Sequence, residues 1–174
     1  GVLLDLGYNG GIILPSAFAS KFTSEYEQVI YDNSTSGIYG TNIDTLTTKR
    51  LDLILGNRNY KVDIEFSNLG KALIGNDFLE HFTVFINYET KEISLIPQSK
   101  IELSPPYDFI PGILNDSLWV VDRIHEKSAL NIGDTLSSVN GLKPADLYDS
   151  YCDYVYNIRK LLNADSIHYE KLSR

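Results

Sequence analysis

The sequence predicts a mainly β protein of two domains, and three observations carry this prediction. The first 97 residues contain short apolar or alternating runs separated by turn residues, which is the pattern of strands. A polar, proline-rich stretch over 98–106 then breaks every periodicity and is the predicted linker. Beyond it, strand-like runs accompany one amphipathic helical stripe, so a smaller domain with both kinds of element is expected over 107–174.

The first domain is predicted to consist of short strands joined by tight turns. Helical segments are expected at 15–22, where proline suits a helix start, and at 76–82. Turn residues at 56–59 and 88–91 indicate hairpin connections. The expected strands cover residues 2–4, 12–14, 28–31, 51–55, 60–66, 72–74, 82–88 and 92–96.

The second domain is predicted to combine strands with one helix. Strands are expected at 118–121 and 136–139, the latter followed by an Asn140-Gly141 turn, with a closing strand at 167–169. Apolar residues recur at three- and four-residue steps between 145 and 162, which predicts a helix with one buried face. This stripe consists of Leu147, Tyr151, Tyr154, Val155, Ile158 and Leu162.

Composition narrows the function classes. The net charge of −8 argues against a nucleic-acid partner, because such binding depends on Lys and Arg neutralising phosphates. No apolar run approaches the roughly 18 residues needed to span a bilayer, so no membrane span is expected. The single cysteine, Cys152, allows no internal disulfide and no cysteine cluster for zinc. No metal or other cofactor is expected.

Two motifs frame the first domain. Residues 2–7 form an apolar run ending in Asp5-Leu6-Gly7, and residues 72–79 read Ala-Leu-Ile-Gly-Asn-Asp-Phe-Leu. Together they resemble one lobe of an aspartic peptidase of the retropepsin-like or pepsin-like kind. The resemblance implies a closed, barrel-like β lobe, in which a later apolar-apolar-Gly strand packs behind the catalytic turn. It also implies that Asp5 is catalytic and that Gly7 contacts substrate. Leu6 stands where the family has Thr or Ser.

The residues themselves also point to Asp5, because this carboxylate follows an apolar run and precedes a glycine that permits a tight turn. An aspartic peptidase needs two carboxylates that share one proton around a water molecule. The second carboxylate is expected from a missing N-terminal lobe or from a second copy of the chain. The chain contains no methionine and begins close to the motif, which favours a missing lobe. Alternatively, Asp5 caps a turn in a lobe without activity.

Residues 34–41 read Ser-Thr-Ser-Gly-Ile-Tyr-Gly-Thr, where the peptidase family carries a flap that covers substrate. The resemblance implies that Ile38, Tyr39 and Gly40 contact substrate, and glycine permits the mobility that a lid needs. An ordinary exposed hairpin loop is the alternative, since Gly and Ser are common turn residues.

The second domain resembles a PDZ domain of the bacterial type over 107–174. Residues 128–141 carry the resemblance, with a small-residue turn, Gly133-Asp134 and a strand ending in Asn140-Gly141. It implies a peptide-binding groove between the strand near 109–113 and the helix over 145–162. Pro111 lacks the N–H that strand addition uses. The expected groove residues are Phe109, Ile110, Ile113, Tyr151 and Val155.

The leading hypothesis is therefore an aspartic endopeptidase fragment whose PDZ-like domain positions a peptide or protein substrate. The alternative is a catalytically degenerate lobe that serves as a protein or peptide interaction module. Leu6 favours the alternative, and the retained Asp5 favours the enzyme. The compartment stays open, with the periplasmic or extracellular side of a bacterium as a guess.

Overall fold

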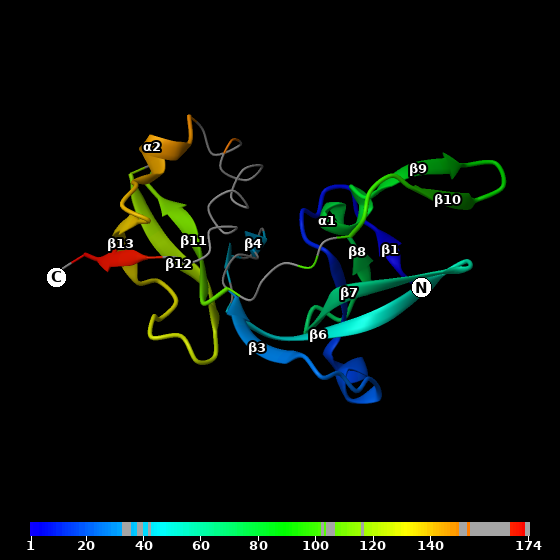
Figure 1. Cartoon of the computed structure of the whole chain (residues 1–174), viewed down its shortest axis with the longest axis horizontal. Coiled ribbons are helices and arrows are strands. Elements are labelled where there is room, and N and C mark those ends of the chain that lie inside the picture. Colours follow the sequence, from blue (N-terminus) through cyan, green and yellow to red (C-terminus); the bar gives the residue numbers. More distant parts are fainter. Residues whose placement is uncertain are drawn as a thin grey trace. The chain divides into compact units, whose positions relative to one another are not determined.

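The computed structural model describes residues 1–32, 36–37, 40–41, 43–101, 103, 107–115, 117–149, 153 and 168–172. Strand accounts for 51% of the structure and helix for 11%, which confirms the prediction of a mainly β protein (Figure 1). The chain forms two compact units. The first consists of Gly1–Val29 and Leu46–Leu103, and the second of Ile30–Thr45 and Ser104–Arg174.

The first unit is built on a mixed sheet. Its strand order is β1-β8-β2-β7-β6, with parallel β1–β8 and β2–β7 pairs and antiparallel β2–β8 and β6–β7 pairs. The long β6–β7 hairpin turns at Gly56, whose φ of 60° is readily adopted by glycine. The strands are β1 (Leu3–Leu4), β2 (Ile12–Pro15), β6 (Asp44–Leu55), β7 (Arg58–Ser67) and β8 (Leu73–Ile74).

The expected closed barrel is wrong for the part of the chain that the structure describes. Closure requires every strand to be paired on both sides. The sheet instead remains open, because β1 pairs only with β8 and β3 (Glu27–Asp32) does not return to β1. The last hairpin, β9 (Phe82–Asn87) with β10 (Glu92–Pro97), forms a separate two-stranded sheet and pairs with neither β1 nor β3.

Two short helical turns complete the first unit, a 3₁₀ helix η1 (Ser16–Lys21) and α1 (Asn76–Leu79). Both lie within the expected helical segments, but α1 ends earlier than residue 82. The core of the unit gathers apolar residues from β2, β7, α1 and β9, which removes them from water. Its buried members are Ile12, Val62, Ile64, Phe66, Phe78, Leu79 and Phe82.

The second unit is built around strand β12. Strand β12 (Leu118–His125) pairs with β11 (Phe109–Leu114) along its length, with β13 (Thr135–Val139) near its start and with β3 near its end. Strand β14 (Tyr169–Lys171) pairs with β13. A small pair, β4 (Ser36–Gly37) with β5 (Gly40–Thr41), also belongs to this unit.

The core of the second unit surrounds Trp119, which is fully buried and donates its Nε1–H to the carbonyl of Leu142 at 2.8 Å. Asn140 and Gly141 both have positive φ, as a type I′ turn requires, so the predicted Asn-Gly turn is confirmed. Helix α2 (Pro144–Leu147) starts where the long helix was expected. It leaves helical geometry at Tyr148, and 150–152 and 154–162 of the expected helix lie outside the described residues.

Candidate functional site

Asp5 follows β1 directly and begins a turn that is hydrogen-bonded to β8. Leu3 and Leu4 pair in register with Leu73 and Ile74, and the Asp5 N–H continues this ladder to the Ile74 carbonyl at 3.0 Å. The prediction that the apolar-apolar-Gly segment lies beside the Asp-Leu-Gly turn is therefore confirmed.

Gly75 allows the chain to cross itself behind this turn. A Cβ on Gly75 would lie 2.4 Å from the Gly10 carbonyl oxygen and 2.6 Å from that of Tyr8. The Gly75 N–H donates to the Gly11 carbonyl at 2.8 Å, so the backbone fills the space where a side chain would stand. Only glycine fits without moving the loop that follows Asp5.

Asn76 holds the turn by hydrogen bonds. Its side-chain amide donates to the Leu6 carbonyl at 2.9 Å and to Asn9 Oδ1 at 3.3 Å, while its backbone N–H donates to the Tyr8 carbonyl at 2.8 Å. Sequence reasoning missed this role. The available signal was the position of Asn76 directly after Gly75 in the second motif, with a side chain that suits bonds to backbone.

Asp5 is half-buried as a residue, and its Oδ1 accepts the Gly7 N–H at 3.0 Å. This bond fixes the side chain in one orientation, as an Asx turn does. The same bond agrees with the turn-capping interpretation. Leu6, between them, is 61% exposed and offers no hydroxyl. The turn can therefore hold one carboxylate in place, and a second must join it before two can share a proton.

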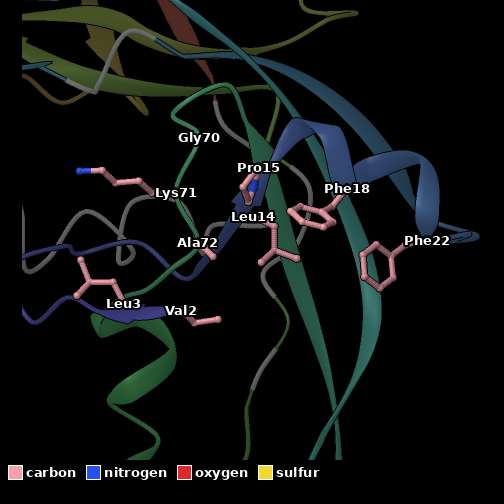
Figure 2. A pocket seen from close by; sticks show the side chains of 10 residues that line it. Val2, Leu3, Leu14, Pro15, Phe18, Phe22, Gly70, Lys71 and Ala72 are labelled. Atoms are coloured by element: carbon pink, nitrogen blue, oxygen red, sulfur yellow. The ribbon is translucent and has the colours of Figure 1, made fainter.

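An open apolar hollow of about 700 Å³ lies beside β1 (Figure 2). Phe18 and Phe22 of the segment around η1 stand on one side, and Val2 and Leu3 stand on the other, with Lys71 pointing away from the aromatic rings. Several of these apolar side chains are unusually exposed, Leu3 by 54%. The lining is completed by Gly1, Leu14, Pro15, Gly70 and Ala72.

The expected flap residues belong to the second unit, whereas Asp5 and Gly7 belong to the first. Gly40 pairs with Gly37 where β4 and β5 run antiparallel. Ile38 and Tyr39 lie outside the described residues, and their contact with substrate stays a prediction.

The expected groove residues of the second unit differ in burial, and two of them lie outside the described residues. Phe109 is 1% exposed and packs edge-on against Tyr169, with ring centroids 5.5 Å apart, so it fills the core. Ile110 and Ile113 are half-buried, and Ile113 also packs against that core. Tyr151 and Val155 lie outside the described residues.

A cluster of charges that sequence reasoning missed lies where β12 meets β3. Arg123 donates to the nearly buried Asp32 at 2.6 Å. Burial raises the pKa of Asp122, and the charge of Asp32 raises it further. The Asp122 carboxylate crosses Gly112 of β11 so closely that a Cβ there would meet it. The signal in the sequence was an Asp-Arg pair inside an apolar strand.

Among the described residues, no group of three or more His, Cys, Asp or Glu side chains is arranged to hold a metal ion. Likewise, no helix in the described part of the chain has the length and apolar character to cross a membrane. No protein-family model, curated protein or solved structure matches this chain.

Proposed function

We propose that the chain is one lobe of an aspartic peptidase, in which Asp5 supplies one of two catalytic carboxylates, joined to a unit that binds peptide. The supporting observation is that several hydrogen bonds hold the turn at Asp5. Asp5 is held by the β8 ladder, by Gly7 and, through Leu6, by Asn76. A fixed carboxylate acts better as a base or acid because its orientation is set before the reaction.

In this proposal Asp5 shares one proton with a carboxylate from another lobe or a second copy. The ionised member takes a proton from the attacking water, and the protonated member donates to the carbonyl oxygen of the scissile peptide. No covalent intermediate is needed, which is consistent with a site that presents a carboxylate and backbone groups.

The apolar hollow supports an apolar peptide side chain as part of the substrate. Leu3 lines the hollow and lies two residues before Asp5 in the chain. An apolar side chain in the hollow would gain roughly 1.5–3 kcal/mol from burial, before the costs of association.

The test uses the full-length product of the natural gene, an unfolded casein substrate and a pH of about 4 to 5, where one of two close carboxylates is protonated. We expect cleavage that pepstatin inhibits and that Asp5→Asn abolishes. Asp52→Asn is the control, since Asp52 is an exposed carboxylate in the same unit. Cleavage that survives Asp5→Asn, or an inactive full-length product, would overturn the peptidase proposal.

A second candidate is an interaction module without activity, which the exposed Leu6 and the Asp5–Gly7 capping bond favour. Its binding surface would be the outer edge of β11, which pairs only with β12 among the described strands. The bulge between Ile110 and Pro111 weakens this edge for strand addition. Titration of labelled C-terminal peptides tests it by amide shifts. Binding to β11 together with an inactive full-length product would select this candidate.

A further inference from the structure

Strand β9 of the β9–β10 hairpin in the first unit lacks the usual protection of a sheet edge. Both strands pair only with each other among the described residues (Figure 1), while Phe82, Val84 and Leu95 pack the base of the hairpin on the core of the first unit. Edge strands are normally protected by charge, proline, a bulge or a covering element. Strand β9 reads Phe-Thr-Val-Phe-Ile-Asn, with no charge and no proline, and its six pairs to β10 run without a bulge.

The hairpin also exposes apolar side chains on both faces. On one face Ile86 and its pair Ile93 are 40% and 46% exposed. On the other face Phe85 is 55% exposed, beside Ile96 at 48%. Apolar exposure on both faces of an unprotected strand is typical of an edge that is covered by another strand.

We infer that β9 pairs antiparallel with β9 of a second copy of this chain, about a two-fold axis at Phe85. Directly opposed residues of an antiparallel pair lie on the same face. With the axis at Phe85, the two Phe85 rings face each other, Val84 opposes Ile86, and Thr83 opposes Asn87. Each pair matches in character, and none brings two charges together.

The lack of charge on β9 permits pairing with a second copy, and the self-complementarity of the strand favours a second copy over another partner. A chain of net charge −8 repels its own copies, and this repulsion is smallest where a strand carries no charged residue. A two-fold interface also needs a self-complementary strand, and the pairing about Phe85 provides one. This inference is independent of the proposed peptidase function, because it does not involve Asp5.

Cysteine cross-linking tests the register directly. All samples carry Cys152→Ser, which removes the single native cysteine. In the proposed pairing, the two Cα atoms at position 85 lie about 4.5–5.5 Å apart, within disulfide range. Those at position 88 lie about 20 Å apart, because three residues separate each from the axis. We therefore expect Phe85→Cys to form a cross-linked dimer on mild oxidation, and the matched control Tyr88→Cys to form at least tenfold less.

Sedimentation provides the second measurement, without any cysteine. The native chain should show a reversible monomer–dimer equilibrium at concentrations between about 10 and 500 µM, as a small interface allows. Phe85→Lys should abolish the dimer by placing two like charges at the axis. Ile54→Lys, which removes a more exposed apolar side chain on β6 of the same unit (73% against 55%), should retain it. A native chain that stays monomeric, or equal cross-linking at positions 85 and 88, would overturn the inference.

Discussion

Gly75 closes the Asp5 turn, because its missing Cβ leaves room for the carbonyl oxygens of Tyr8 and Gly10. The nearby Gly11 differs, since a Cβ there would meet nothing within 4 Å. The two glycines lie on either side of one hydrogen bond, from the Gly75 N–H to the Gly11 carbonyl. Substituting each of them in turn therefore separates the effect of a steric clash from the general effect of replacing a glycine.

Gly75→Ala should destabilise the first unit by about 1–3 kcal/mol, the usual cost of forcing extra atoms into a packed site. Gly11→Ala should change the free energy of unfolding by less than about 1 kcal/mol, because alanine restricts the unfolded chain and meets no obstacle. Urea unfolding of both variants measures the difference. Equal losses in the two variants would show that the crossing at Gly75 tolerates a side chain.

Asp122 should make the second unit less stable as the pH rises. Its pKa is raised in the folded state, so the folded chain binds this proton more tightly than the unfolded chain. The resulting stabilisation is complete below the unfolded pKa, near 3.8, and is lost as the pH rises through the raised value. Asp122→Asn should therefore be more stable than the native chain at pH 7, with a smaller difference at pH 4. Urea midpoints at both pH values measure this, and a pH-independent difference would exclude charge as the cause.

At the scale of elements, three residue pairs and an ion pair join β3 to β12. The pairs join Ile30, Tyr31 and Asp32 to His125, Ile124 and Arg123, and the Asp32 side chain is 4% exposed. A nearly buried carboxylate depends on its cation, because removing one partner leaves an uncompensated charge. The ion pair therefore contributes to holding the end of β3 against β12.

Arg123→Met should destabilise the second unit by roughly 2–3 kcal/mol, somewhat less than for a fully buried pair, since the Arg123 side chain is 20% exposed. Lys61→Met is the control, because its contact with Asp52 is 3.9 Å long and both side chains are 59% exposed. This control should shift the unfolding free energy by less than about 0.5 kcal/mol. A small effect of Arg123→Met would mean that Asp32 finds a sufficient partner elsewhere.

Sequence patterns located most strands because alternation is a local signal, and the Asp5 turn was predictable because its two motifs are local too. The start of β6 was missed, since Thr48 and Lys49 look solvent-exposed in the sequence but are buried. Lys49 is buried because its ammonium reaches the Phe22 carbonyl and Glu27, each at 3.0 Å. The bond from Asn76 to Leu6 spans 70 residues, and no local pattern reports a contact of that range.

At the scale of the whole molecule, the two units are not contiguous in sequence. Residues 30–45 belong to the second unit, yet they lie in sequence between the two parts of the first. A linear change of composition marks a linker near 98–106, but it cannot reveal a segment that pairs far along the chain. The ladder between β3 and β12 joins residues about ninety positions apart, which is why the sequence predicted contiguous domains.

Because residues 30–45 of the second unit lie within fragment 1–103, we expect fragments 1–103 and 104–174 to associate when mixed. Fragment 104–174 lacks the β3 partner of Arg123, so alone it should unfold at lower urea than the same residues in the intact chain. Adding 1–103 should restore the ladder and the ion pair, and raise the midpoint in a concentration-dependent way. The same fragment with Asp32→Ala should restore less, because Arg123 then lacks its carboxylate. Urea titrations followed by Trp119 fluorescence measure all three states, since Trp119 is the single tryptophan and lies in the core of the second unit. If 104–174 unfolds at the intact chain's midpoint without 1–103, residues 30–45 contribute nothing to its stability.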